Sequence, residues 1–294
     1  MYDVICAGQA VLDCITRGRE SEPYKPNVYR ADTIRLHIGG DAVNEAVALA
    51  GLGLRVAVVC GLGRDIAGNI IADELGRAGV HTERVRRADL DTPIANLQVA
   101  RDGSRVSVNS GATRLAGFRV DPEDVKGARV VSLASLFRPP LEDFGDIRAL
   151  IRAAKEAGAI VCADTKLPLR EALSLDGLGD ALSLVDYLFP NEKEAAYYTG
   201  KDSFPEMARA LTARGVKNVV VKAGPLGCFV RGGGEEFALP AVPVENVVDT
   251  TGAGDNFVAG FISGVLAGAS LRGCAERGLR QAASAITHTG GARA

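Results

Sequence analysis

The chain has 294 residues, of which 47% are hydrophobic and 24% are charged, and its formal net charge is −2. This composition is typical of a globular protein with one large α/β domain or two ordinary ones. The near-neutral charge provides no basic surface for a phosphate backbone, so we expect no nucleic-acid partner. No apolar run approaches the ~18 residues of a membrane span, and the N-terminus lacks the cationic start of a signal peptide. We therefore expect no membrane partner and a cytoplasmic location.

The 6 cysteines and 3 histidines are scattered along the chain. No two cysteines form a C-x-x-C pair, and four of the six lie inside apolar runs. Disulfide frameworks and zinc sites show short, regular spacings, which are missing here. We therefore interpret the cysteines as small core residues.

Short apolar runs alternate along the chain with longer segments of helical period. The runs predict buried parallel strands at 4–7, 56–59, 130–133, 160–163, 187–189 and 219–221. The periodic segments predict helices at 42–52, 67–78, 147–157, 192–198 and 204–214. This order predicts one domain over residues 1–294, with helices on both faces of a mostly parallel sheet.

Two segments interrupt this alternation, at about residues 17–38 and 92–109. Neither has a helical period, and Thr33–Ile38 alternates in the manner of a strand with one exposed face. We interpret both segments as antiparallel strands of a small lid inserted into the domain. Because such strands have free edges, the lid is expected to close over a substrate or to pair with a second subunit in a homodimer.

The most informative stretch is Val-Val-Asp-Thr-Thr-Gly-Ala-Gly-Asp, which ends at Asp255 and precedes an almost wholly apolar helix. Gly260, Gly264 and Gly268 are spaced four residues apart, which indicates close packing of that helix against another backbone. A glycine-rich turn at a helix N-terminus favours an anion. Asp255 is interpreted either as an ordinary N-terminal charge or as a general base beside a phosphate cradle.

The residues from Asp249 to Asp255 and the helix after them closely resemble the second signature of the ribokinase-like (PfkB-type) carbohydrate kinases. The resemblance implies a ribokinase-like three-layer αβα fold with a small β-strand lid. It implies that Asp255 is the catalytic base, and that the N–H groups of Gly252, Ala253 and Gly254 hold the γ-phosphoryl group. This assignment agrees with the demands of phosphoryl transfer, which depends mainly on positioning and charge stabilisation.

The segment 39–53 resembles the family's first signature, in which a Gly-Gly turn opens a helix. The resemblance implies that Gly39, Gly40, Asp41 and Asn44 bind the acceptor, together with Asp13 after the first strand. Taken alone, Asn44 is also explained as a helix cap and Asp13 as a solvated loop carboxylate.

Asn191 and Glu194 match the family's Asn-x-x-Glu motif, which implies a magnesium site reached from Glu194 through water. Taken alone, Glu194 is also explained by dipole compensation in a first helical turn. The resemblance implies that the nucleotide is bordered by Asn191 and by the strand and turn with Lys222, Gly224 and Gly227. Asp249 and Thr251, with a loop at about 286–291, occupy the family's potassium site.

Three segments depart from the family or from other patterns. Gly61, Gly63 and Gly68 have a spacing that a dinucleotide fold does not allow, so we interpret this segment as structural. Residues 164–170 only loosely match a sugar-kinase motif, and the roles of Asp164 and Lys166 stay open. The chain ends at Ala294, where relatives usually continue, so the far edge of the nucleotide pocket is expected to be incomplete.

The resemblance implies ATP-dependent phosphorylation of a sugar, with ATP and Mg²⁺ as cofactors and K⁺ as a further candidate. We favour a neutral sugar of the ribose or fructose type, phosphorylated at a primary hydroxyl, because Asp13 and Asp41 would repel an anion. A ketodeoxy sugar acid, a nucleoside and a non-catalytic sugar-binding function are the alternatives. The lid offers only Tyr24 and Tyr29 to stack a base. An acid would need one of five basic residues, which are Arg35, Arg105, Arg114, Arg138 and Lys166.

Overall fold

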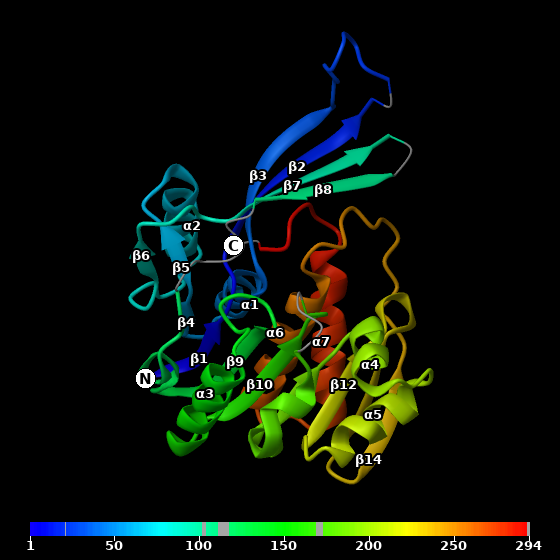
Figure 1. Cartoon of the computed structure of the whole chain (residues 1–294). Helices are drawn as coiled ribbons and strands as arrows, with labels where there is room; N and C mark the ends of the chain where they lie inside the picture. Colours follow the sequence, from blue (N-terminus) through cyan, green and yellow to red (C-terminus); the bar gives the residue numbers. More distant parts are fainter. Residues whose placement is uncertain (21, 102–103, 111–117, 169–172, 293–294) are drawn as a thin grey trace.

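The computed structural model describes residues 1–20, 22–101, 104–110, 118–168 and 173–292. Its centre is an eight-stranded sheet, and a four-stranded sheet rises from one end of it (Figure 1). The order of strands across the central sheet is β14 (Glu235–Leu239), β13 (Cys228–Gly232), β12 (Asn218–Lys222), β11 (Tyr187–Phe189), β10 (Ile160–Thr165), β9 (Ala128–Leu136), β1 (Tyr2–Ala7) and β4 (Val56–Val59).

All six strands expected from the apolar runs lie in this sheet, and they pair in parallel. The last two strands, β13 and β14, form an antiparallel hairpin at the edge, which the sequence analysis did not predict. Gly233 and Gly234 join them with φ values of 58° and 83°. Two consecutive glycines between short runs are a hairpin signal, so this pair could have been found.

Helices cover both faces of the sheet, which makes the three-layer arrangement expected from the sequence. One face carries α1 (Asp41–Gly51), α6 (Ala253–Leu266) and α7 (Leu271–Ala285). The other carries α3 (Phe144–Glu156), α4 (Glu192–Thr199) and α5 (Phe204–Ala213), with the short turns η2 (Pro122–Val125) and η3 (Leu175–Leu184). Alternate residues of β1 enter the two hydrophobic cores, Ile5 on one side and Cys6 on the other.

A small unit beside β4 contains α2 (Ile66–Arg77) and the strands β5 (Gly61–Gly63) and β6 (Arg86–Ala88). The carboxylate of Asp65 caps α2 by accepting from the N–H of Gly68 at 2.7 Å, and it also accepts from the N–H and hydroxyl of Thr92. These contacts agree with the interpretation of the glycine-rich segment with Gly61, Gly63 and Gly68 as a structural turn.

The lid is a four-stranded sheet in the order β3 (Thr33–Gly39), β2 (Val11–Arg19), β7 (Ile94–Ala100) and β8 (Arg105–Asn109). The strands β2 and β7 are parallel, and the other two pairs are antiparallel. The sheet starts earlier in the chain than the expected boundary at residue 17, because β2 begins at Val11 directly after β1. One continuous segment therefore connects the central sheet to the lid.

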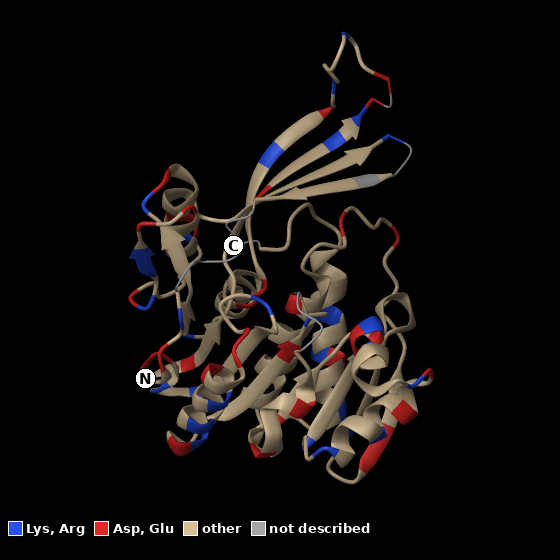
Figure 2. Ribbon diagram, in the orientation of Figure 1, with Lys and Arg blue, Asp and Glu red and all other residues tan. Residues whose placement is uncertain are grey.

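Lys and Arg are interspersed with Asp and Glu over the helices and loops, as Figure 2 shows. No helix in the described part of the chain is long and apolar enough to cross a membrane.

The packing of α6 against α7 explains two of the three spaced glycines. A Cβ atom on Gly260 would lie 2.6 Å from the carbonyl oxygen of Arg277, and one on Gly264 would lie 2.9 Å from the Cα atom of Cys274. The expectation for Gly268 was wrong, because α6 ends at Leu266. Gly268 instead adopts a φ of 70°, which favours glycine just beyond a helix.

We predict that Gly260→Ala lowers the free energy of unfolding by about 1–3 kcal/mol, because the added methyl group meets a rigid backbone. The matched control is Gly76→Ala in α2, where a Cβ atom would have no heavy atom within 4 Å. That control should raise stability by about 0.5–1 kcal/mol through helix propensity. Urea unfolding of both variants measures the difference, and equal effects would contradict this account of the packing.

Candidate active site

The carboxylate of Asp255 lies in the first turn of α6, near the carboxyl ends of the central strands, and is buried. The side-chain amide of Asn44, on α1, donates to its Oδ2 atom at 2.6 Å. Burial and the nearby charge of Asp41 raise the pKa of Asp255 to about 7, although Lys166 and Asn44 oppose the rise. A carboxylate with a pKa near neutrality is well suited to accept a proton from a hydroxyl group.

The residues expected to bind an acceptor come from β2, from α1 and from the Gly39–Gly40 turn between β3 and α1. Asp41 is the first residue of α1, after the turn of Gly39 and Gly40, and accepts a hydrogen bond from the hydroxyl of Ser135. A Cβ atom on Gly39 would lie 2.2 Å from the carboxylate of Asp13, and one on Gly40 would lie 2.5 Å from the carbonyl oxygen of Gln9. Gly40, with a φ of 90°, is therefore required by the close approach of the start of α1 to the segment that enters the lid, whereas a side chain at Gly39 would displace the Asp13 carboxylate.

Asp13 and Asn44 each have a feature that suits a substrate-binding role. Burial, with the charges of Asp249 and Asp41, raises the pKa of Asp13 to about 6. The Oδ1 atom of Asn44 is buried and has no hydrogen-bond partner among the described residues. The cap interpretation of Asn44 is not supported, because its side chain reaches Asp255 rather than a helix N–H group.

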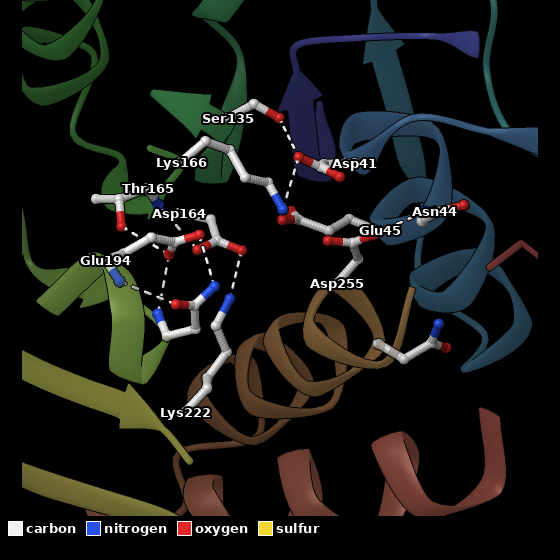
Figure 3. Close-up of polar contacts among 12 residues, drawn as sticks. Asp41, Asn44, Glu45, Ser135, Asp164, Thr165, Lys166, Glu194, Lys222 and Asp255 are labelled. Carbon is white, nitrogen blue, oxygen red and sulfur yellow. Dashed lines mark hydrogen bonds and ion pairs between the residues drawn. The ribbon is translucent and has the colours of Figure 1, made fainter. Parts of the chain in front are cut away.

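Lys166 is the site residue whose role the sequence left open. Its ammonium group lies 3.1 Å from Asp41 and points towards the region of Asp255 (Figure 3). Burial would lower the pKa of Lys166, but Asp41, Asp255, Asp164 and Glu194 raise it above the usual range. The ammonium group therefore stays charged and offsets the negative charge around Asp255.

The turn before α6 has the geometry of an anion hole. Gly252 is the N-cap with a φ of 71°, and a Cβ atom there would lie 2.5 Å from the Cα atom of Gly291. The N–H of Ala253 donates to the carbonyl of Thr250 at 3.3 Å. Of the three N–H groups expected to hold an anion, those of Gly252 and Gly254 are therefore the stronger donors. First-turn N–H groups have no partner within their helix, so they favour an anion here.

Lys222, at the end of β12, places its ammonium group beside this turn. A Cβ atom on Gly254 would lie 3.3 Å from the Nζ atom of Lys222. The same ammonium group forms an ion pair with the buried carboxylate of Asp164 at 2.5 Å. Lys222 can therefore contribute positive charge to a phosphate bound at the turn.

Glu194 and Asp164 form a second pair of neighbouring carboxylates. Figure 3 shows this pair on the opposite side of Lys166 from Asp41. The carboxylate of Glu194 accepts from the side-chain amide of Asn191 at 2.7 Å and from the hydroxyl of Thr165 at 3.1 Å. Burial and the charge of Asp164 raise the pKa of Glu194, although Lys222 opposes the rise. Glu194 lies in the first turn of α4, as the dipole interpretation expected, and it also forms a reciprocal cap with Asn191.

Asp249 and Thr251, the expected potassium ligands, contact each other in the segment directly before the anion-hole turn. The Oδ1 atom of Asp249 accepts from the hydroxyl and the N–H of Thr251, at 2.8 and 3.1 Å. Its Oδ2 atom accepts from the N–H of Gly290 at 3.1 Å and pairs with the guanidinium of Arg17 at 3.0 Å. The sequence analysis did not identify Arg17, which comes from the lid.

Two cavities meet at the anion-hole turn. One, of about 770 Å³, is lined by Asp13, Asp41, Asn44 and Asp255. The other, of about 790 Å³, is lined mainly by apolar residues such as Val244, Phe257 and Leu279, together with Gly227 of the turn η4 (Gly224–Leu226). Five residues line both cavities, and they are Lys222, Gly224, Thr250, Ala253 and Gly254.

Among the five basic residues considered for an acidic acceptor, Arg138 and Lys166 line the first cavity. Arg35 is exposed on β3, and Arg105 belongs to β8. Arg114 lies outside the described residues, as does Arg170 of the loosely matching segment. The two lid tyrosines lie away from the cavity, where Tyr24 stacks on Arg30 and Tyr29 on Arg19.

An apolar slot and a polar cavity that share a glycine-rich anion hole, with a buried carboxylate at the polar side, define a phosphotransferase acting on a hydroxyl group. Comparison with known proteins agrees, because the family model "pfkB family carbohydrate kinase" matches residues 1–294. The chain therefore belongs to the pfkB family, and it is an ATP-dependent carbohydrate kinase.

Relatives with different substrates resemble the chain to a similar degree. It is 28% identical to a 2-dehydro-3-deoxygluconokinase of Bacillus subtilis, over 91% of this chain and 87% of that protein. It is 30% identical to a cytidine kinase of Thermococcus kodakarensis, over 86% and 88%. The structure of Arabidopsis thaliana ribokinase complexed with ribose and ATP superposes with a TM-score of 0.82 at 28% identity, covering 98% of this chain and 94% of that one.

We predict that kcat/KM rises with pH through an apparent pKa near 7, because Asp255, the expected base, can accept a proton only when its carboxylate is ionised. Below that pH the carboxyl group is protonated and activity falls. Lys166→Gln should move the apparent pKa upward, since the ammonium group favours the carboxylate. Asp41→Asn should move it downward, since one repelling charge is lost.

Rate profiles between pH 5 and pH 9, measured for the three proteins, check these directions. Shifts of the same sign in both variants would contradict the assignment of the titrating group. Both variants are expected to bind the acceptor more weakly. Weaker binding lowers the height of the rate profile but does not move the pH of its midpoint.

Proposed function

We propose that this protein transfers the γ-phosphoryl group of ATP to a primary hydroxyl of a neutral sugar, with Asp255 as the general base. The observation that carries the proposal is the pair of cavities that meet at the anion-hole turn. The apolar cavity suits an adenine ring, and the polar cavity suits a polyol. A phosphate bound at the shared residues would lie between the two, next to Asp255.

In the proposed reaction, Asp255 removes the proton of the acceptor hydroxyl while Asp13, Asp41 and Asn44 hold the other hydroxyl groups. The N–H groups of Gly252, Ala253 and Gly254, with the ammonium group of Lys222, stabilise the charge on the transferred phosphoryl group. Asn191, Gly224 and Gly227 border the nucleotide. The ammonium group of Lys166 offsets part of the negative charge of Asp41 and Asp255 between the acceptor and the phosphate.

The resemblance implies two metal ions, of which this proposal includes Mg²⁺. The hard oxygen donors of Glu194 and Asp164 fit Mg²⁺, which keeps most of its water and binds few carboxylates directly. When bound, the ion would neutralise charge on the ATP phosphates. At Asp249 and Thr251, where the resemblance implies potassium, the guanidinium of Arg17 already pairs with the Asp249 carboxylate, so the proposal does not include K⁺.

The acceptor class follows from the charges in the polar cavity. Asp13, Asp41 and Asp255 all line it, and the ammonium group of Lys166 is already paired with Asp41. This balance favours a neutral acceptor. A ketodeoxy sugar acid is the second candidate, because the guanidinium of Arg138 also lines the cavity and could bind a carboxylate. The described lining includes no aromatic side chain to stack a nucleoside base.

The test is a comparison of kcat/KM for ribose, fructose, 2-dehydro-3-deoxygluconate, fructose 6-phosphate and cytidine. We expect a neutral sugar to be the best substrate and Arg138→Met to leave its kcat/KM within about twofold. Asp255→Asn should lower kcat by ~10²–10⁴ with nearly unchanged ATP binding. The residual turnover of this variant gives the background rate for the substrate comparison.

A preference for an anionic acceptor that is lost in Arg138→Met would overturn the neutral-sugar assignment in favour of the acid. Substantial turnover by Asp255→Asn would contradict the base assignment instead. A protein that binds sugar but transfers no phosphate would support the alternative of a non-catalytic binding protein.

We also propose that the protein forms a homodimer through the lid, in the cytoplasm expected from the sequence. The register of the lid strands places Ile34, Leu36, Val106 and Val108 on the face opposite to Asp13. These four side chains are between 50% and 67% exposed. An apolar face of this kind, with two free strand edges, suits a second copy of the same sheet.

We predict that light scattering shows a dimer at micromolar protein concentration, and that Leu36→Asp converts it to a monomer. A carboxylate on this face would be buried without a partner in the dimer. The control is Ile66→Asp at the start of α2, an exposed apolar residue outside the lid strands, which should leave the dimer intact. A monomeric native protein would exclude the lid dimer.

A further inference from the structure

Arg17 connects the lid to the segment that supports the anion hole. It lies on β2, and its Nη1 atom donates to the carbonyl oxygen of Val248 at 2.8 Å. Its Nη2 atom pairs with the carboxylate of Asp249 at 3.0 Å. The segment that it contacts continues through Thr250 into the turn at Gly252. One guanidinium group therefore binds a carbonyl and a carboxylate directly before the anion hole.

The carboxylate of Asp249 has no remaining capacity for another ligand. An ionised carboxylate offers about four lone-pair positions. Four donors fill them, which are the N–H and hydroxyl of Thr251, the N–H of Gly290 and the guanidinium of Arg17. Burial would raise the pKa of Asp249, but these hydrogen bonds and the charge of Arg17 lower it, so the carboxylate is ionised.

A positive charge is required at this position. Asp249 is 3% exposed, and an unpaired buried carboxylate would be strongly destabilising. His37, on the neighbouring strand, does not supply the charge, because burial and the nearby Arg35 and Arg17 lower its pKa although Asp249 opposes this. Of these neighbours, Arg17 alone carries a positive charge and touches the carboxylate.

We propose that Arg17 is the built-in cation of the anion-hole segment, in the place where a monovalent metal ion would otherwise bind. A carbonyl oxygen and a carboxylate oxygen are the ligands that such an ion takes, and here both are held by a covalently attached guanidinium. Activity then does not depend on potassium. Arg17 is a positioning residue, since it acts on the phosphate only through the backbone between Val248 and Gly252.

The position of Arg17 also links the acceptor to the anion hole. Arg17 and Asp13 are four residues apart on β2, so their side chains lie on the same face of the strand. A movement of β2 that accompanies acceptor binding at Asp13 would therefore change the contact of Arg17 with Asp249.

The test compares the native protein with Arg17→Ala in potassium, sodium and N-methyl-D-glucamine chloride at equal ionic strength. Native turnover should agree within about twofold across the three salts, because salt acts only by screening. Arg17→Ala should lose roughly 10- to 100-fold in the organic salt through misplacement of the anion hole, and potassium should restore much of this loss. Arg17→Lys, which keeps a charge, should respond little to the salt.

Thermal unfolding without ATP or acceptor provides a second measurement that does not depend on the proposed function. Potassium should raise the Tm of Arg17→Ala by about 2 °C or more relative to the organic cation, and should not change that of the native protein. The control is Arg101→Ala, which removes a lid arginine that pairs with the exposed Asp32 at 2.6 Å. This control should show no specific response to potassium.

Two results would overturn the proposal. One is a native enzyme that potassium activates several-fold, which would mean that the ion binds despite Arg17. The other is an Arg17→Ala protein that shows no potassium response in either turnover or Tm. If no acceptor is phosphorylated by any of the proteins, the proposed function fails, and the Tm comparison still decides whether Arg17 replaces an ion.

Discussion

The structure of the site depends on keeping one carboxylate dry and still available for proton transfer. Burial favours the protonated form of Asp255, whereas a hydrogen bond from Asn44 and the charge of Lys166 favour the ionised form. Burial, together with the charge of Asp41, outweighs these two contacts and raises the pKa to about 7. The dry environment comes from α6, whose apolar surface packs against α1 and α7 and brings its first turn into the interior.

This requirement explains why so many glycines surround the site. The first turn of α6 can reach Asn44 only if Gly252 passes the backbone of Gly291, and α1 can approach only if Gly40 passes the backbone of Gln9. A side chain at any of these positions would separate the helix ends and admit water. Water would lower the pKa of Asp255 towards that of a free carboxylate and weaken the anion hole.

The sequence predicted the six parallel strands and the helices between them, because buried runs and helical periods are local patterns. The residues near Asp255 were found through the family resemblance, since Asn44 and Asp13 taken alone had ordinary structural explanations. The sequence could not place Lys166, Ser135 or Arg17, since each belongs to a segment whose residues give no local indication of a partner. Ser135 and Asp41 are distant in the chain, as are Arg17 and Asp249, and only the folded sheets bring them together. Gly268 was misplaced for a different reason: the four-residue spacing continues beyond the end of the helix.

Each cation of the site neutralises a particular carboxylate, and each comes from a different strand. Lys166 follows β10 and pairs with Asp41, Lys222 ends β12 and pairs with Asp164, and Arg17 of the lid pairs with Asp249. Breaking a buried ion pair leaves an uncompensated charge, so these pairs hold the two sheets and α1 in one arrangement. The cations of the first two pairs line the polar cavity. The third lies behind the anion hole, where its role is to keep the turn in place while the charges in front of it change.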